Sequence, residues 1–198
     1  MSLVSSKTLY IDNVDSLPLQ ENLTIWTDQF PNGGVLAFVA EHNLKSIDSL
    51  QRYFNDYPLI GAVFPELIVE GGFKKEGILL IHFEKMPDYC ITPVLHRSLS
   101  LDAITSDITS CLNIGIDDSE QALFMIFDSM IPNIASIIDE TYLHVGDNVN
   151  YMGVNAGSET FQPINCLFDN KQFIGDAVLS MLIPQHSGAI VEHGYTNP

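Results

Sequence analysis

Continuous apolar runs mark the interior of the fold along the chain. Val35–Ala40, Leu59–Phe64 and Ala122–Phe127 contain no polar residue. Runs of this length without polar alternation are typical of strands that are buried on both faces of a sheet. Further strands are expected at the other β-prone apolar runs, Gly77–Phe83, Cys90–Leu95, Val149–Val154, Ile164–Phe168 and Gly175–Ile183.

Three segments carry apolar residues at helical spacing. After Ser46, a candidate N-cap, Ile47, Leu50 and Phe54 fall at positions i, i+3 and i+7. The same test predicts two further helices, one with Leu101, Ile104, Ile108 and Cys111/Leu112 on a face, the other with Ile131, Ile134, Ile138, Tyr142 and Val145. Each helix is expected to bury one face against a sheet.

The N-terminal segment has a weaker pattern. Thr8–Asp12 and Leu23–Thr27 are short and rich in β-branched and aromatic residues, and Pro18 lies between them. We expect both to be edge strands or extended chain. Residues 1–32 are therefore interpreted as a lead-in to a domain that covers residues 33–198.

The order of elements repeats within that domain. Strand, helix, strand and strand follow one another from Val35 to Ile81, and the same order returns from Ala122 to Leu179, offset by about 90 residues. We predict an α/β fold of two pseudo-repeated strand–helix–strand–strand halves, about residues 33–97 and 98–192. They should form mixed sheets with helices on the outer faces.

Charge narrows the classes of partner. The 198 residues include 8 Lys+Arg and 25 Asp+Glu, a formal net charge of −17. This balance argues against nucleic acid, because phosphate neutralisation needs cations, and against anionic membrane surfaces. It leaves two interpretations open, a self-repelling acidic surface or one that steers cationic ligands and partners. No apolar stretch approaches the ~20 residues of a membrane helix, and no signal peptide is evident, so a cytoplasmic location is expected.

Cofactor and metal signatures are missing from the sequence. There is no phosphate-binding glycine loop, and the six histidines lack metal-ligand spacing. Cys90, Cys111 and Cys166 are distant from one another, and none belongs to a Cys-x-x-Cys motif. We therefore expect no cofactor, no metal, and three reduced, unbridged thiols.

Two strand-end turns are the candidate binding features. Gly61 lies in a buried strand that Pro65 interrupts, and Glu66 follows the break. Tyr151–Ser158 repeats the arrangement with small residues. A glycine inside a strand marks a close approach of backbone or ligand, and free N–H groups in such turns can hold a carboxylate. The alternative is that both glycines serve only tight sheet packing.

The ligand hypothesis assigns roles within these turns. Glu66 and Asn155 would supply polar contacts in one shared concave site. The residues that would supply backbone groups and space are Gly61, Ala62, Gly153, Ala156 and Gly157.

These motifs resemble the FIST domain family. Gly61–Glu66 is similar to the family's small-residue turn Gly-Cys-Ser-x-x-Gly-Glu, with Phe64-Pro65 in place of the usual small polar pair, and Gly153–Gly157 is similar to its second turn. Gly175–Leu179 resembles the strand that follows, and His193–Pro198 resembles the junction to the family's C-terminal half.

The resemblance implies a non-catalytic sensory domain of intracellular signal transduction. Such a domain would bind a small molecule, amino acids among the candidates, and would act on a C-terminal FIST half or a downstream signalling protein. Two alternatives stay open. One is a hydrolase-like enzyme with Glu66 or Asp128 as the base and a histidine supplied by the fold, although no nucleophile, base and orienting group occur in a recognisable local arrangement. The other is a pure protein-interaction module.

Overall fold

The computed structural model describes residues 6–19, 21–94, 100–112, 114 and 120–188. Within these residues the strands form two mixed sheets and a separate hairpin. The first sheet has the order β1 (Ser6–Ile11), β6 (Ile78–Phe83), β2 (Gly34–Ala40), β3 (Leu59–Phe64), β10 (Leu167–Asp169) and β11 (Phe173–Ile174). The second has the order β7 (Asp88–Pro93), β12 (Ala177–Pro184), β8 (Gln121–Asp128) and β9 (Asn150–Ala156).

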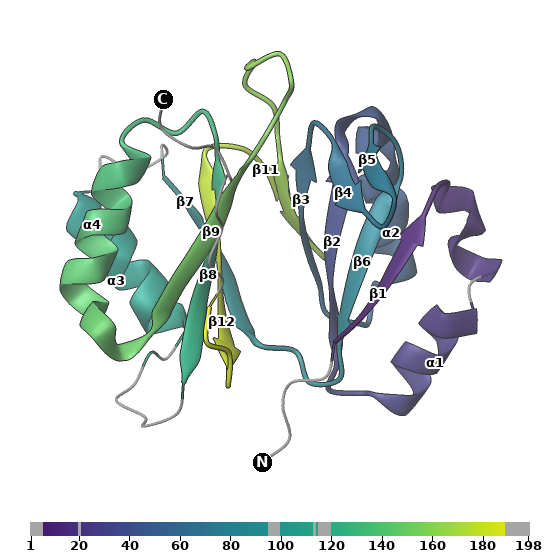
Figure 1. Ribbon diagram of the computed structural model, residues 1–198, viewed down its shortest axis with the longest axis horizontal. Coiled ribbons are helices and arrows are strands. Elements are labelled where there is room, and N and C mark those ends of the chain that lie inside the picture. The colour runs from purple at the N-terminus through teal and green to yellow at the C-terminus, as the bar shows by residue number, and fades with distance from the viewer. Residues whose placement is uncertain (1–5, 20, 95–99, 113, 115–119, 189–198) are drawn as a thin grey trace, which may run out of the picture.

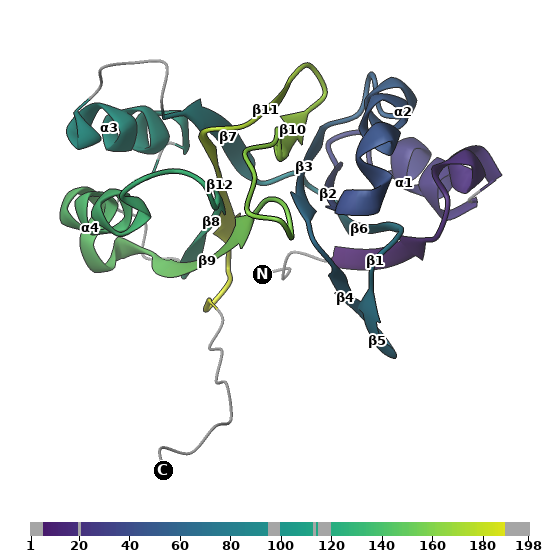
Figure 2. The same ribbon diagram turned by 90° about the horizontal axis from the view of Figure 1, so that it is seen from above.

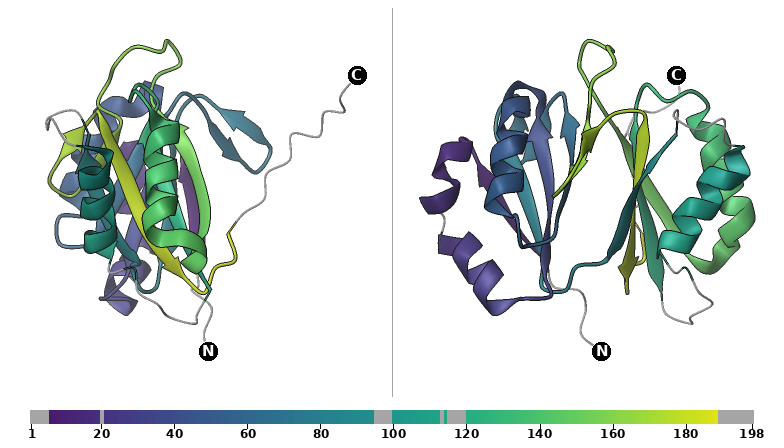
Figure 3. Two further views of the ribbon diagram at one scale, coloured as in Figure 1. Left: turned by 90° about the vertical axis from the view of Figure 1, so that its left-hand side faces the viewer. Right: turned by 180° about the vertical axis from the view of Figure 1, so that it is seen from behind.

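The two sheets face each other, and helices cover their outer faces (Figure 1, Figure 3). The helices are α1 (Glu21–Gln29), α2 (Ile47–Tyr53), α3 (Leu101–Leu112) and α4 (Ile134–Val145), with 3₁₀ turns η1 (Val14–Leu19), η2 (Glu41–Ser46) and η3 (Gly146–Asn148). The hairpin of β4 (Leu67–Val69) and β5 (Gly72–Lys74) projects away from the first sheet (Figure 2). This architecture confirms the predicted α/β class with mixed sheets and outer helices.

Two hydrophobic cores hold the layers together. The larger core includes Leu36 and Ala62 of the first sheet together with Ile126, Leu179 and Met181 of the second, so it joins the two sheets. The smaller core lies between the second sheet and the helices α3 and α4. Burial of apolar surface in both cores is the main force that stabilises this arrangement.

Four strands of the first sheet, β1-β6-β2-β3, have the same order and directions as the second sheet, β7-β12-β8-β9. β2 is parallel to β3 and antiparallel to β6, and β6 is antiparallel to β1. In the second sheet β8 is parallel to β9 and antiparallel to β12, and β12 is antiparallel to β7. The superposition of the two halves in space, which the repeated sequence pattern predicts, stays a prediction.

The expected strand at Leu23–Thr27 is wrong. These residues lie in helix α1, which buries Leu23 and Trp26 while Thr24 and Ile25 face solvent. A spacing of three between the buried positions is helical, and their burial in the core outweighs the β-propensity of Thr, Ile and Trp. The lead-in thus contributes β1 and α1 to the fold, and β1 forms the edge of the first sheet next to β6.

The apolar face of α4 differs from the expected one. Ile137, Thr141 and Val145 are buried, whereas Ile138 and Tyr142 are 41% and 47% exposed. The Thr141 hydroxyl donates to the Ile137 carbonyl oxygen at 2.7 Å, which satisfies this polar group inside the core. Because the buried face includes Thr141, the spacing of apolar residues alone does not identify it.

Among the described residues, no helix is both long enough and apolar enough to cross a membrane. The predicted junction at His193–Pro198 lies outside the described residues.

Candidate functional site

The two predicted turns meet in the structure. The backbone N–H of Gly157, just after β9, donates a hydrogen bond of 2.9 Å to the carbonyl oxygen of Val63 in β3. The carboxyl ends of β3 and β9 therefore adjoin where the two sheets face each other (Figure 1). Ligands of α/β proteins commonly bind beyond the carboxyl ends of strands.

Gly61 and Ala62 are buried inside the first sheet. Ala62 is completely buried, and a Cβ atom at position 61 would collide with the Ala37 carbonyl oxygen and the Phe168 ring. Phe168 of β10 thus occupies the space above Gly61. This geometry favours the packing explanation for the first glycine over direct contact with a ligand.

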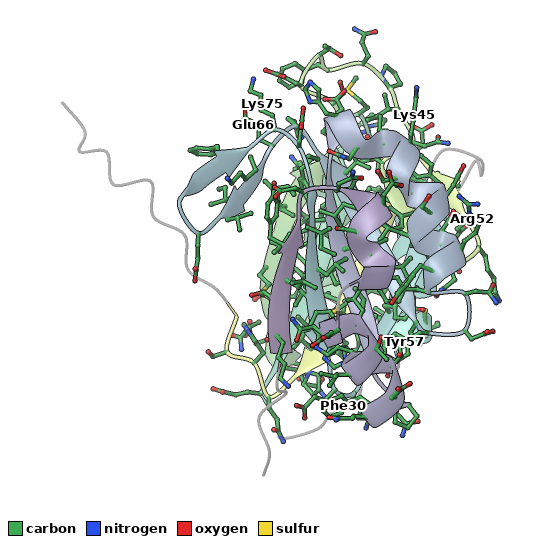
Figure 4. The ribbon with its side chains drawn as sticks, turned by 90° about the vertical axis from the view of Figure 1, so that its right-hand side faces the viewer. Phe30, Lys45, Arg52, Tyr57, Glu66 and Lys75 are labelled. Carbon is green, nitrogen blue, oxygen red and sulfur yellow. The ribbon has the colours of Figure 1, made fainter. Side chains whose placement is uncertain are left out.

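Glu66 is held at the base of the β4–β5 hairpin. Its Oε1 atom lies 3.3 Å from Nζ of Lys75, and the same ammonium lies 3.9 Å from Oε1 of Glu159, beyond β9. Figure 4 shows Glu66 and Lys75 beside each other near the hairpin. The side chain of Lys75 is 60% exposed, so solvent screens these ion pairs and they contribute little to stability.

Glu41 joins the turn after β2 to the turn after β9. It was not among the candidate residues of the sequence analysis. It follows β2 directly, and its Oε1 accepts a hydrogen bond of 2.5 Å from the Ser158 hydroxyl. Its Oε2 accepts a hydrogen bond of 2.9 Å from the backbone N–H of Glu159. A glutamate directly after the buried run Val35–Ala40 is the sequence signal that could have identified it.

Gly153 and Asn155 pair with Met125 and Phe127 of β8, which pack in the smaller core, so they lie on the side of the second sheet that α3 and α4 cover. They line a groove of about 370 Å³ beside α4, together with Met125, Phe127, Ile138, Tyr151, Met152 and Val154. β9 is the edge of the second sheet, and a Cβ atom at position 153 would lie 2.5 Å from the Met125 carbonyl oxygen. The structure therefore brings Ala156 and Gly157 to Val63 but separates Gly153 and Asn155 from Gly61, Ala62 and Glu66.

A polar cavity of about 360 Å³ opens next to the joined turns. Asp128 at the end of β8 forms part of its wall, and Asp128 pairs with Ala156 of β9. The other lining residues are Pro93, Pro163, Ile164, Asn165, Gln172, Ile174, Gly175 and Asp176. Because Gln172 and Ile174 belong to the β10–β11 hairpin of the first sheet, the cavity spans both sheets.

Asp128 is a buried carboxylate with both oxygens hydrogen-bonded. It is 3% exposed, its Oδ1 accepts from the Met130 N–H at 2.9 Å, and its Oδ2 accepts from the Asp176 N–H at 2.7 Å. A carboxylate buried in this way is tolerated because hydrogen bonds compensate its lost hydration. The Cys166 side chain also hydrogen-bonds this carboxylate, and of its roughly four lone-pair positions one remains to accept a hydrogen bond from a ligand.

The backbone opposite Asp128 is tightly constrained. A Cβ atom at Gly175 would lie 2.8 Å from the Ile164 carbonyl oxygen and 3.2 Å from Oδ2 of Asp128, so this position requires glycine. Asp176 adopts a φ of 50°, which is uncommon for a residue other than glycine. Such strained positions are concentrated at functional sites.

The thiol beside Asp128 is not activated. Cys166 is completely buried, and burial followed by the neighbouring Asp128 carboxylate raises the pKa of its thiol. A thiol held neutral is a poor nucleophile. Cys166 therefore provides no activated nucleophile beside Asp128.

Asp102, Glu140 and His144 form a cluster with metal-ligand chemistry between α3 and α4. His144 Nε2 lies 3.0 Å from Oδ1 of Asp102, and His144 Nδ1 lies 3.5 Å from Oε1 of Glu140. These three potential ligand atoms lie within 4.8 Å of one another at the surface. The two ion pairs account for this geometry without a metal.

Comparison with known proteins places the chain in a family. A search of the curated proteins finds no match for the chain. The family model of the FIST N domain matches residues 34–197, which include both joined turns and the residues around the polar cavity. The chain therefore belongs to the FIST family, as a FIST N domain.

Proposed function

We propose that this domain is a non-catalytic sensor that binds a small molecule carrying an ammonium group in the cavity at Asp128. Buried Asp128 carries the proposal, because this acidic residue lines a hollow of about 360 Å³ at the ends of the strands. The charged lining residues, Asp128 and Asp176, are both acidic. A zwitterionic amino acid or a similar metabolite has the complementary charge.

The position of the cavity suggests how binding would be sensed. Its walls come from the second sheet at Asp128 and Pro93, and from the first sheet's hairpin at Gln172 and Ile174. A ligand that contacts both walls would favour one relative arrangement of the two sheets. This fits the association of the FIST family with sensory roles in signal transduction.

A thermal-shift series tests the ligand class. The probes are an amino acid, the amine that lacks its carboxylate, and the acid that lacks its ammonium group. A ligand at a hundred times its Kd stabilises by about 2.7 kcal/mol, which raises the Tm of a domain of this size by about 5–10 °C. Each probe set is repeated for a panel of amino acids. The proposal expects a shift with an amino acid and with its amine, and no shift with the acid.

Three variants localise the effect. Asp128→Asn and Asp176→Asn should remove the shift, whereas Asp28→Asn, which changes the same charge on exposed α1, should retain it. Asp176→Asn keeps the test interpretable if the buried Asp128 variant fails to fold. A wild-type shift that survives in both cavity variants, or no shift with any amino acid or amine, contradicts the proposal.

A protein-interaction module is the second candidate, and the β4–β5 hairpin favours it. Ile68 and Phe73 are cross-strand partners that are 73% and 72% exposed on this projecting element. We propose that the hairpin contacts a C-terminal FIST half or a downstream signalling protein in the cytoplasm. Co-purification with such a partner should weaken in Ile68→Ser and Phe73→Ser, while ligand shifts remain.

A further inference from the structure

Two of the three thiols lie together between β7 and α3. Cys90 is in β7, and its side chain packs against the core that α3 covers. Cys111 is in the last turn of α3, and its Sγ donates to the backbone carbonyl oxygen of Tyr89 at 3.6 Å. Because Tyr89 directly precedes Cys90, the helix delivers the Cys111 sulfur to the strand segment that carries Cys90.

The two thiols differ in accessibility. Cys111 is exposed, whereas Cys90 is partly buried with its Sγ 3.9 Å from the Thr92 hydroxyl. Burial, followed by the neighbouring Cys111 side chain, raises the pKa of Cys90 to about 12. Cys90 therefore stays protonated, and a reagent from solution reaches Cys111 first.

We propose that Cys90 and Cys111 form a redox-reactive pair, which a low-molecular-weight disulfide such as oxidised glutathione converts into an intramolecular disulfide. All three cysteines are free thiols in the structure, and Cys166 is buried apart from this pair beside Asp128. The inference does not depend on the ligand proposed for the cavity.

The reaction has two balanced exchange steps. The Cys111 thiolate attacks one sulfur of oxidised glutathione, which forms a mixed disulfide and releases one glutathione thiolate that takes up the proton lost by Cys111. The Cys90 sulfur then attacks the Cys111 sulfur as its own proton leaves, so the Cys90–Cys111 bond forms and the second glutathione departs as a thiol. The protein loses two hydrogen atoms, and one oxidised glutathione is reduced to two thiols.

The roles of the two thiols predict different products in single variants. Cys90→Ser should stop at the first step and retain one glutathione on Cys111. Cys111→Ser should not react in the folded protein, because it lacks the exposed thiol. Cys166→Ser is the matched control and should behave like the wild type.

Intact mass and peptide mapping after treatment of the native protein with oxidised glutathione test the proposal. The expected wild-type product lacks two hydrogens, carries no glutathione, and yields a linked peptide containing Cys90 and Cys111. A rise in Tm after oxidation should occur in the wild type and Cys166→Ser, and not in Cys90→Ser. A wild type that keeps glutathione on Cys111, a Cys111→Ser variant that still oxidises, or an unreactive wild type overturns the proposal.

Discussion

The backbone N–H of Gly157 donates to the carbonyl oxygen of Val63 at 2.9 Å, across the boundary between the two sheets. Val63 lies in the interior of the first sheet, between β2 and β10, whereas Gly157 follows the edge strand of the second. Val63 in turn donates its own N–H to the carbonyl oxygen of Cys166 at 2.8 Å. Val63 thereby holds both ends of the segment 157–166, which contributes Pro163, Ile164 and Asn165 to the wall of the cavity.

Gly157→Ala should destabilise the protein by about 1–3 kcal/mol. Gly157 has a φ of 139°, and a Cβ atom there would lie 2.6 Å from the Ser129 hydroxyl oxygen. Gly71→Ala is the matched control, because Gly71 also has positive φ, at 93°, but has open space around it. Urea unfolding should show the larger loss for Gly157→Ala, and equal losses would mean that contact with Ser129 is unimportant.

Glu41 and Ser158 should be energetically coupled. Glu41 accepts hydrogen bonds from the Ser158 hydroxyl and the Glu159 N–H, and so joins the turn after β2 to the turn after β9. A double-mutant cycle of Glu41→Ala and Ser158→Ala should give a coupling energy of about 1 kcal/mol. Pairing Glu41→Ala with Thr27→Ala on α1, whose hydroxyl bonds within its own helix, should give no coupling.

The layers of this fold follow from its apolar runs. Val35–Ala40 and Ala122–Phe127 contain no polar residue, which favours buried strands, and both are strands in the structure. Leu23–Thr27 was ambiguous because five residues can satisfy a strand or a helix pattern. Only the core contacts of Leu23 and Trp26 decide in favour of the helix.

Each strand-end turn could be predicted from the sequence, whereas the residues that pack around it could not. Strand-interior Gly61 signals a close approach, but the sequence does not reveal that Phe168, more than a hundred positions later, fills the space. The cavity at Asp128 likewise depends on the β10–β11 hairpin, which joins the first sheet although it follows β9 of the second. Long-range pairing of this kind leaves no local pattern of polar and apolar residues.

A substitution at Gly153 is a poor probe of ligand binding, because it would disturb the packing of β9 on β8. A Cβ atom at this position would lie 2.5 Å from the Met125 carbonyl oxygen, which is backbone and has little freedom to move. Loss of a ligand-induced thermal shift in Gly153→Val would therefore report damage to the second sheet. Asp176→Asn changes only charge and is the more informative variant.

His82 should make the protein less stable as the pH falls below about 6.5. It is completely buried and stacks on Trp26 with a ring separation of 4.7 Å, and its Nε2 lies 2.9 Å from the Tyr57 hydroxyl. Burial lowers the pKa of His82 to about 4, against the smaller opposing effect of Glu84, while Lys7 lowers it further. The unfolded chain therefore binds a proton between pH 6.5 and 4 that the folded chain does not.

The expected loss of unfolding free energy from pH 7 to pH 5 is about 2 kcal/mol. His82→Phe should reduce this pH dependence, because phenylalanine preserves the ring stacking and does not titrate. Tyr57 retains the Trp26 carbonyl oxygen, 3.4 Å away, as a hydrogen-bond acceptor in this variant. Urea titrations at both pH values make the comparison, and an unchanged slope in His82→Phe would show that other groups cause the effect.

His144 should act with the opposite sign. The Glu140 backbone carbonyl, 3.0 Å from His144 Nδ1, raises the pKa of this imidazole, and Asp102 and the Glu140 carboxylate raise it further against partial burial. The folded state thus favours the protonated form. Its contribution to stability is fully present below the pKa of the unfolded chain and is lost as the pH rises through the higher folded-state value.

Asp102→Asn should lower the pKa of His144, because the carboxylate oxygen 3.0 Å from Nε2 would be replaced by a neutral amide. An NMR titration of the imidazole measures this directly. Asp139→Asn, on the exposed side of the same helix α4, removes an equal charge and should leave the His144 pKa nearly unchanged. Equal decreases in the two variants would mean that the overall negative charge of the protein, rather than the contact with Asp102 across α3 and α4, sets the protonation of His144.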